Sequence, residues 1–141
     1  MNQLRIEIAV EPQHDDMEFI SQQIVEFNSR NAAEDDYKTL VAFLRDSSDN
    51  LVGGLVAETY WQWLCIVVLW VHESFRGAGY GKALLAAAEQ EAVKRGCQYA
   101  YLDTFSFQAL EFYQKRGYVV FGELPNFPQG HSRYFLKKEL K

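Results

Sequence analysis

An unbroken apolar run followed by a glycine-rich loop constrains the fold of this chain more than any other feature. The run occupies residues 64–71, and the loop 76–82 reads Arg-Gly-Ala-Gly-Tyr-Gly-Lys. An alanine- and leucine-rich stretch at 83–93 follows and predicts a helix. Loop amides and the first amides of a helix have no intrahelical partner, and the helix dipole adds positive potential. The pattern therefore predicts a strand, an anion-binding loop and a helix, with a phosphorylated cofactor as ligand.

The glycine spacing separates this loop from two other phosphate-binding motifs. Dinucleotide-binding folds use G-x-G-x-x-G, whereas the glycines here are Gly77, Gly79 and Gly81. A P-loop has Ser or Thr directly after its Gly-Lys pair, but Ala83 follows Lys82. A tight turn with a helix cap and no ligand is the other interpretation that the loop by itself allows.

Length and charge limit the class of protein. A chain of 141 residues predicts one domain, residues 1–141, and 48% hydrophobic residues can supply its core. The N-terminus has no signal-peptide pattern, and 64–71 is too short to span a bilayer, so we expect a cytoplasmic protein without membrane contact. A net charge of −5 argues against nucleic acid as partner. It favours a cationic substrate, although a solvated acidic surface explains the same charge.

The remaining periodicities predict an α/β domain with a mixed sheet. The expected strands are 5–10, 39–44, 51–60, 64–71, 99–104, 118–121 and 132–138, and the expected helices are 15–28, 83–93 and 107–116. Asp15 and Glu18 resemble a capping box, and Ser106 is placed to cap the last helix. The Gly53-Gly54 pair indicates a bulge or a close backbone approach. The wholly apolar strand 64–71 indicates coverage on both faces, and 64–104 predicts a right-handed parallel crossover.

Two motifs together resemble the GNAT superfamily of N-acetyltransferases. The spacing Arg76-x-x-Gly79-x-Gly81 resembles the acyl-CoA pyrophosphate loop of that family. The stretch 109–118, Ala-Leu-Glu-Phe-Tyr-Gln-Lys-Arg-Gly-Tyr, resembles a second signature carried on a short helix. It follows the first motif after one strand, as that fold requires, and the resemblance spans nearly the whole chain. It implies a single-domain acyl-CoA N-acyltransferase fold with a mostly antiparallel sheet of six to seven strands and flanking helices.

The resemblance also implies an activity and a cofactor site. It implies transfer of an acetyl group from acetyl-CoA to a primary amine of a small molecule by direct attack. A peptide or protein amine, or a non-catalytic acetyl-CoA-binding regulatory module, are the alternatives. The pantetheine arm would pair with the backbone of Leu69, Trp70 and Val71, although Trp70 also fits the core. The diphosphate would bind the loop residues Arg76, Gly77, Ala78, Gly79, Tyr80, Gly81 and Lys82.

The catalytic candidates follow from the chemistry of acyl transfer. A thiolate of pKa about 8.5 must leave, and the phenol of Tyr113, with a pKa of about 10, is a suitable acid. The alternative role of Tyr113 is packing on the sheet. The attacking amine needs a base, for which Glu58, His72 and Glu73 are candidates, with Glu58 assigned the role. Ser106 stands where the family often has an asparagine that supports the cofactor, and its shorter side chain weakens that assignment.

The acceptor pocket is the least constrained part of the sequence. The resemblance places it at 28–38 and 60–63. The acidic cluster at 34–36 is suited to a cationic acceptor, or is a solvated loop. Trp61 and Trp63 fit a pocket wall or a homodimer interface. Cys65 and Cys97 have no Cys or His at metal-ligand spacing, so we assign them to packing and expect no metal.

Overall fold

The computed structural model describes residues 3–141, whose contacts form two compact units divided between Glu34 and Asp35. The first unit contains one helix, α1 (His14–Asn31). Residues 3–13 form neither helix nor strand, so the predicted strand at 5–10 is wrong. A strand needs a neighbouring strand for its backbone hydrogen bonds, and a helix, which pairs its own backbone groups, offers none. A single domain over residues 1–141 stays a prediction.

Helix α1 is longer than its sequence signals indicate. It ends at Asn31 rather than near Asn28, and it begins after Gln13, whose side chain makes no capping hydrogen bond. The predicted capping box is therefore wrong, because Asp15 already lies in the first helical turn. An acidic side chain in that turn still interacts favourably with the helix dipole.

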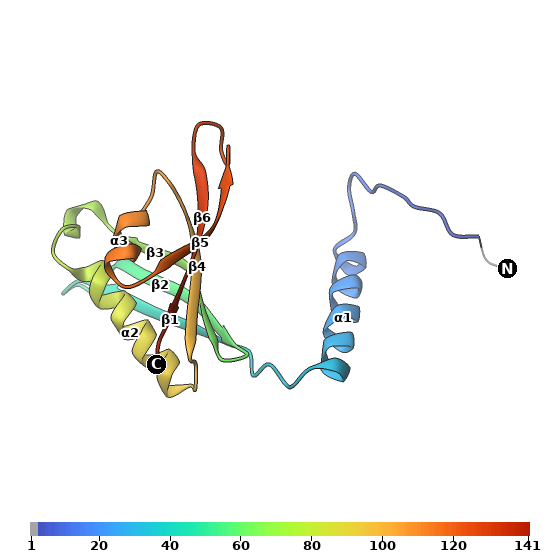
Figure 1. The fold of residues 1–141 in the computed structure, drawn as a ribbon, viewed down its shortest axis with the longest axis horizontal. Coiled ribbons are helices and arrows are strands. Elements are labelled where there is room, and N and C mark those ends of the chain that lie inside the picture. Colours follow the sequence, from blue (N-terminus) through green and yellow to red (C-terminus); the bar gives the residue numbers. More distant parts are fainter. Residues whose placement is uncertain (1–2) are drawn as a thin grey trace. The chain divides into compact units, whose positions relative to one another are not determined.

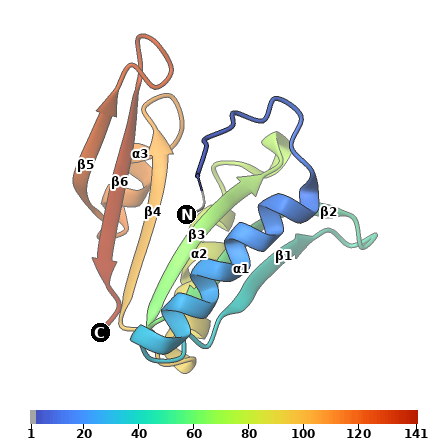
Figure 2. The same ribbon diagram turned by 90° about the vertical axis from the view of Figure 1, so that its right-hand side faces the viewer.

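The second unit is built on a six-stranded sheet with the order β1-β2-β3-β4-β6-β5 (Figures 1 and 2). Only β3 and β4 pair in parallel, and every other neighbouring pair is antiparallel, which confirms the predicted mixed, mostly antiparallel sheet. The strands are β1 (Lys38–Arg45), β2 (Leu51–Tyr60), β3 (Trp63–Val71), β4 (Tyr99–Phe105), β5 (Val119–Pro125) and β6 (Ser132–Glu139).

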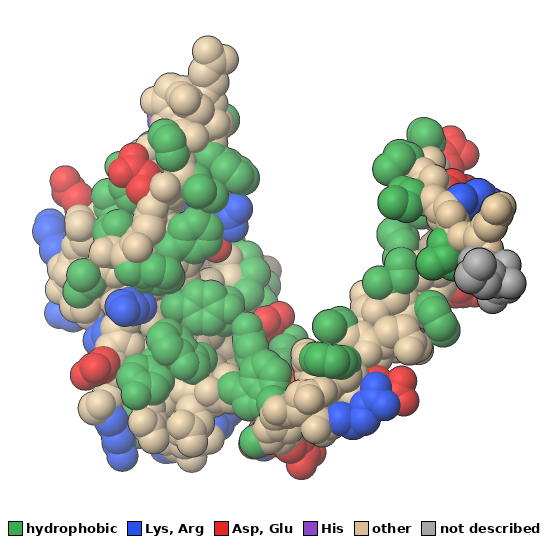
Figure 3. Space-filling model, turned by 45° about the vertical axis from the view of Figure 1, so that its right-hand side comes forward, with side chains coloured by type: hydrophobic (Ala, Val, Ile, Leu, Met, Phe, Trp, Pro, Cys, Tyr) green, Lys and Arg blue, Asp and Glu red, His purple; other side chains and the backbone are tan. Residues whose placement is uncertain are grey.

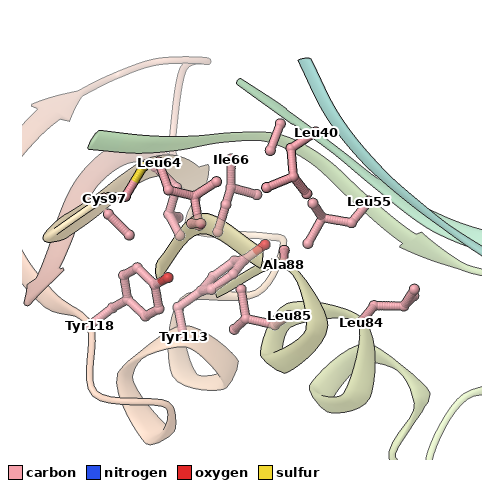
Figure 4. Close-up of a cluster of buried hydrophobic side chains, with 14 of the residues drawn as sticks. Leu40, Leu55, Leu64, Ile66, Leu84, Leu85, Ala88, Cys97, Tyr113 and Tyr118 are labelled. Atoms are coloured by element: carbon pink, nitrogen blue, oxygen red, sulfur yellow. The ribbon is translucent and has the colours of Figure 1, made fainter. Parts of the chain in front are cut away.

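Helix α2 (Tyr80–Lys94) connects the two parallel strands and supplies the core. Its buried residues are Leu84, Leu85, Ala88 and Ala92. Figure 4 shows Leu85 and Ala88 between the helix and the sheet that carries Leu55, Leu64 and Ile66. A 3₁₀ turn, η1 (Glu73–Phe75), precedes α2, and the short helix α3 (Leu110–Lys115) follows β4. None of the helices in residues 3–141 is long and apolar enough to cross a membrane.

Within the second unit, helices cover only one face of the sheet. Along β2, the side chains of Leu55, Ala57 and Thr59 are buried while their neighbours are partly or fully exposed. In β3, Val67 and Trp70 are 55% and 46% exposed, so apolar residues also occur where no helix of residues 35–141 covers the sheet. Coverage of both faces of this strand in the whole chain stays a prediction. Figure 3 shows hydrophobic side chains gathered on the surface of this unit.

Close backbone packing explains the adjacent glycines of β2. A Cβ on Gly53 would lie 3.0 Å from the carbonyl oxygen of Trp70, and one on Gly54 would lie 2.9 Å from that of Ala42. The close approach that the sequence indicated is therefore confirmed. The irregularity between β2 and β3 lies further along, because Val56 pairs with Val68 and Ala57 with Ile66. Val67 is left as an extra residue, which is a β-bulge.

The core predicts which substitutions unfold this protein. Leu85→Ala should lower the free energy of unfolding by about 2–5 kcal/mol, because Leu85 is 1% exposed and its loss leaves a cavity beneath the sheet. Urea denaturation measures the change. Val119→Ala is the matched control, since Val119 is 63% exposed, and it should change stability by less than about 1 kcal/mol. Equal losses in both variants would show that α2 does not supply the core.

Candidate active site

A cavity of about 490 Å³ lies where β3 ends, α2 begins and α3 packs. The sequence-predicted residues Leu69 and Val71 line it from β3, and Tyr113 lines it from α3. The loop contributes a larger set, Arg76, Gly77, Gly79, Tyr80, Gly81 and Lys82. Three segments that are separate in sequence therefore meet around one hollow, as the two motifs predicted.

The loop has the backbone conformation that the glycines indicated. Gly77 and Gly79 have φ angles of +78° and +89°, which side chains with a Cβ rarely adopt. A Cβ on either glycine would meet no atom within 4 Å, so the space beside them is open. The first backbone hydrogen bond of α2 runs from the Ala83 amide to the Gly79 carbonyl. The amides of 80–82 therefore have no intrahelical acceptor and can bind an anion.

The charges around the cavity all have one sign. Arg76, Lys82 and Arg116 line it, and no aspartate or glutamate does. Acidic residues outnumber basic ones by 19 to 14 in the whole chain, so this segregation runs against the composition. The Arg76 Nε donates to the Val71 carbonyl at 2.8 Å, which fixes this side chain at the end of β3. Together with the loop amides, these cations make the cavity suited to a phosphorylated ligand.

The strand edge beside the cavity lacks pairing with β4. Parallel pairing runs from Trp63 with Tyr99 to Ile66 with Leu102 and goes no further. The backbone of 67–71 is therefore available on this side for an extended ligand that carries amide groups. Trp70 does not line the cavity; it is 46% exposed, and its ring contacts His72 edge-on at 6.1 Å. Within residues 35–141 the Trp70 side chain is thus not enclosed, and both of its interpretations, as a core residue and as a residue whose backbone binds the pantetheine arm, stay predictions.

Tyr113 is buried between α3 and the sheet with its ring at the cavity (Figure 4). Burial raises the pKa of its phenol to about 12, because the ionised form loses hydration. Within residues 3–141 its hydroxyl forms no hydrogen bond, while its ring packs against Phe112 and Tyr118. At neutral pH the hydroxyl is protonated and can donate a hydrogen bond to a ligand.

Ser106 lies away from this cavity. Its hydroxyl accepts a hydrogen bond from the Ser132 amide at 3.0 Å and lies 3.3 Å from His131 Nδ1. It does not cap α3, which begins after Ala109 rather than at residue 107. Instead, Thr104 Oγ1 accepts from the Ala109 amide at 3.4 Å. The capping prediction is wrong because β6 provides a nearer donor, and cofactor binding by Ser106 stays a prediction.

Glu58 faces away from α2, in a row of polar groups across the sheet. It pairs in register with Cys65 of β3, and Cys65 pairs with Tyr101 of β4. The Tyr37 hydroxyl donates to Glu58 Oε1 at 2.9 Å, and this hydrogen bond is the main cause of the raised pKa of Tyr37. Burial raises the pKa of the Cys65 thiol, and the Glu58 carboxylate raises it further. Glu58 thus lies one rung from the last β3–β4 pair but does not line the cavity.

The other two base candidates are held by local structure. The His72 Nδ1 accepts a hydrogen bond from the Ser74 amide at 3.0 Å, so the ring caps η1. Glu73 is exposed in the first turn of that 3₁₀ helix. Neither residue lines the cavity.

Sequence reasoning missed four cavity residues: Phe75, Ala109, Phe112 and Arg116. Phe112 and Arg116 belong to the second motif, but periodicity alone gives no sign that they face the loop across the cavity. Arg116 stands just before Gly117, where a cation is also expected as a helix stop. Only the packing of α3 against the start of α2 shows its position.

Comparisons with known proteins agree with this architecture. The model of the acetyltransferase (GNAT) family matches residues 3–118. The acetyltransferase Atu2258 of Agrobacterium fabrum is 38% identical over 84% of this chain and 87% of its own length. The blasticidin-S acetyltransferase of Streptomyces morookaense is 44% identical over 64% of this chain and 67% of its own length.

Solved structures show the same likeness. An acetyltransferase from Bacillus cereus is 32% identical and has a TM-score of 0.88, with 94% of this chain and 97% of that chain covered. An aminoglycoside 6'-N-acetyltransferase complexed with coenzyme A is 24% identical, with a TM-score of 0.65 over 86% of this chain and 80% of that chain. At that identity the second likeness shows the fold alone.

The loop conformation predicts a difference between two substitutions at one position. Gly79→Ala should lower the free energy of unfolding by about 1–2 kcal/mol, because alanine is strained at positive φ. Gly79→Asn should lose less, since asparagine tolerates this region better and the space beside the residue is open. Chemical denaturation of both variants measures the difference. The same loss in both would point to a contact of the new side chain rather than to backbone strain.

Proposed function

The chain belongs to the GNAT acetyltransferase family, and we propose that it transfers the acetyl group of acetyl-CoA to a primary amine of a small molecule. The family membership makes it an acyltransferase enzyme. One observation carries the proposal for the acetyl donor: a cavity lined by three cations and no acid lies against an unpaired strand edge and the buried Tyr113. These cations and unpaired backbone groups fit a long ligand with phosphates at one end and amides along its arm.

The acetyl donor would be held mainly by backbone groups. The amides of 77–82 would bind the diphosphate, and Arg76 and Lys82 would add charge-assisted hydrogen bonds from the two ends of the loop. The backbone of Leu69 and Val71 would pair with the amides of the pantetheine arm. Only glycine provides the backbone angles of Gly77 and Gly79 at low cost, which supports a loop shaped for close approach of a ligand.

The reaction needs a site for the charge that develops on the carbonyl oxygen. The amine nitrogen attacks the thioester carbon, the oxygen gains negative charge, and the carbon–sulfur bond then breaks. The β-bulge at Val67 lies next to Ile66, where the β3–β4 pairing ends. A bulge turns backbone groups out of the ladder, so we assign an amide of this bulge to stabilise the oxyanion.

Tyr113 serves better as a hydrogen-bond donor than as a proton source. Burial raises its pKa to about 12, above the ordinary value of a phenol, so the phenol gives up its proton less readily than a free phenol would. A hydrogen bond to the developing thiolate needs no proton transfer and is strong in a desolvated site. We assign Tyr113 this role.

Glu58 is the proposed group for the acceptor amine. A cationic amine of pKa about 10.4 must lose a proton before it can attack, and an ionised carboxylate near β3 both attracts the cation and receives the proton through water. None of the Lys or Arg residues in 3–141 forms an ion pair with Glu58, which accepts a hydrogen bond from the Tyr37 hydroxyl. Its charge therefore remains available to a cationic substrate.

The small-molecule acceptor is favoured by a relative. Blasticidin-S acetyltransferase is named for a small-molecule substrate, and the match covers 64% of this chain. A cytoplasmic location, a homodimer and a peptide acceptor stay predictions of the sequence.

The acetyl donor and the acceptor class can be tested together. Millimolar acetyl-CoA should raise the melting temperature of the protein through ligand linkage, measured by differential scanning fluorimetry. A panel of small amines and N-terminal peptides, assayed for thiol release, should then show turnover with a small amine. An unchanged melting temperature would refute the acetyl-CoA site. A thermal shift without turnover of any amine would favour the regulatory-module alternative.

The role of Tyr113 predicts a split between catalysis and binding. Tyr113→Phe should lower kcat by about 10- to 100-fold, because one hydrogen bond to a developing charge is lost, while the Kd for acetyl-CoA stays within about twofold. Because its pKa is raised to about 12, Tyr113 stays protonated below about pH 11. The wild-type rate should therefore show no falling limb from this group between pH 6 and 10. Equal kcat values for the two proteins would leave Tyr113 with a packing role only.

A further inference from the structure

We infer that Arg116 binds the 3′-phosphate of coenzyme A and so makes this enzyme distinguish coenzyme A from its dephospho form. The inference rests on the proposed function, because it concerns the same cavity. Coenzyme A carries a diphosphate and a separate 3′-phosphate on its ribose. The loop and its flanking cations provide for the diphosphate, and the 3′-phosphate needs a further positive group.

Arg116 lines the cavity from α3, a segment separate from the loop. It follows α3 directly, and its guanidinium carbon lies 4.8 Å from the centroid of the Phe112 ring. The same ring lies beside the start of α2, since a Cβ on Gly81 would be 3.6 Å from it. Phe112 therefore supports the guanidinium near the phosphate end of the cavity, where both residues line the wall.

Arg116 lacks the partner that every other arginine of the second unit has. Arg45, Arg95 and Arg133 contact the carboxylates of Asp49, Glu91 and Asp103, and Arg76 donates to the Val71 carbonyl. Arg116 forms no ion pair within residues 3–141, and its Nε is buried without a hydrogen-bond partner.

This arrangement is costly unless a ligand completes it. A partly desolvated guanidinium without an acceptor loses hydration and gains only its contact with the Phe112 ring. A phosphate monoester bears up to two negative charges and offers oxygens to the planar fork of arginine. The structure therefore favours a phosphate, rather than a neutral part of the cofactor, as the missing partner of Arg116.

The 3′-phosphate is the better assignment than the diphosphate for a geometric reason. The diphosphate is expected against the amides of 77–82, on the loop side of the cavity. Arg116 comes from a different segment, at the end of α3, and its guanidinium lies over the Phe112 ring rather than on the loop. A group that projects from the ribose, away from the diphosphate, can reach this position.

The test compares two ligands with three proteins. Isothermal titration calorimetry of coenzyme A and dephospho-coenzyme A gives Kd values for wild type, Arg116→Leu and Lys115→Leu. Wild type should bind coenzyme A at least about tenfold more tightly than the dephospho form, the size expected for a charge-assisted hydrogen bond. Arg116→Leu should lose most of this ratio and bind the dephospho form as wild type does. Leucine keeps apolar contact with Phe112, so we expect this variant to fold.

Lys115→Leu removes the same charge one residue away, from an exposed position that does not line the cavity. It should keep the wild-type ratio. Arg116→Lys should retain part of it, since lysine keeps the charge but not the planar fork. An equal loss for both ligands in Arg116→Leu, or a wild-type ratio near one, would overturn the assignment while leaving the acetyl-CoA site intact. Failure of wild type to bind either ligand would instead refute the proposed function and the inference with it.

Discussion

The parallel pairing of β3 with β4 stops after Ile66 and Leu102, and the site depends on this break. Four residue pairs align the two strands. Helix α2 connects them and buries its apolar residues against one face of the sheet. Beyond the fourth pair, the backbone of β3 has lost its neighbour on one side. The glycine loop lies at that same end, so unpaired strand groups and unpaired helix amides occur together. Both require a partner from outside the chain or from water.

Local signals explain how much of the site could be predicted from the sequence. The apolar run, the three glycines and the alanine-rich stretch specify a strand, a loop and a helix through contacts between near neighbours. Leu69, Val71 and the predicted loop residues other than Ala78 therefore line the cavity. Tyr113 reaches the same cavity because a short helix after β4 must pack beside α2. Helix ends were less well predicted: α2 starts at Tyr80, ahead of the predicted residue 83, because helical turns begin directly after the positive φ of Gly79.

The positions that the sequence did not predict correctly depend on contacts between segments that are far apart in the chain. Residues 5–10 alternate as a strand would, but alternation does not supply the neighbour that a strand needs. Ser106 has the sequence position of a helix cap, yet its hydroxyl accepts a hydrogen bond from the Ser132 amide at the start of β6. Arg116 looks like an ordinary cation at the end of a helix, and its missing partner is visible only when α3 is seen against the loop. Glu58 lies one rung from the break only because β2, β3 and β4 pair in a specific register.

The distribution of charge across the sheet suggests how the two substrates stay separate until they react. The α2 side presents Arg76, Lys82 and Arg116 to the cavity without an acidic residue. The opposite face presents Glu58, while the nearby Asp103 is already paired with Arg133 at 2.9 Å. In the proposed function, an anionic acetyl donor would be attracted to the first side and a cationic acceptor to the second. The two would meet where β3 and β4 no longer pair. A chain of net charge −5 can thus present a positive site, because three cations and no acidic residue line the cavity beside the strand break.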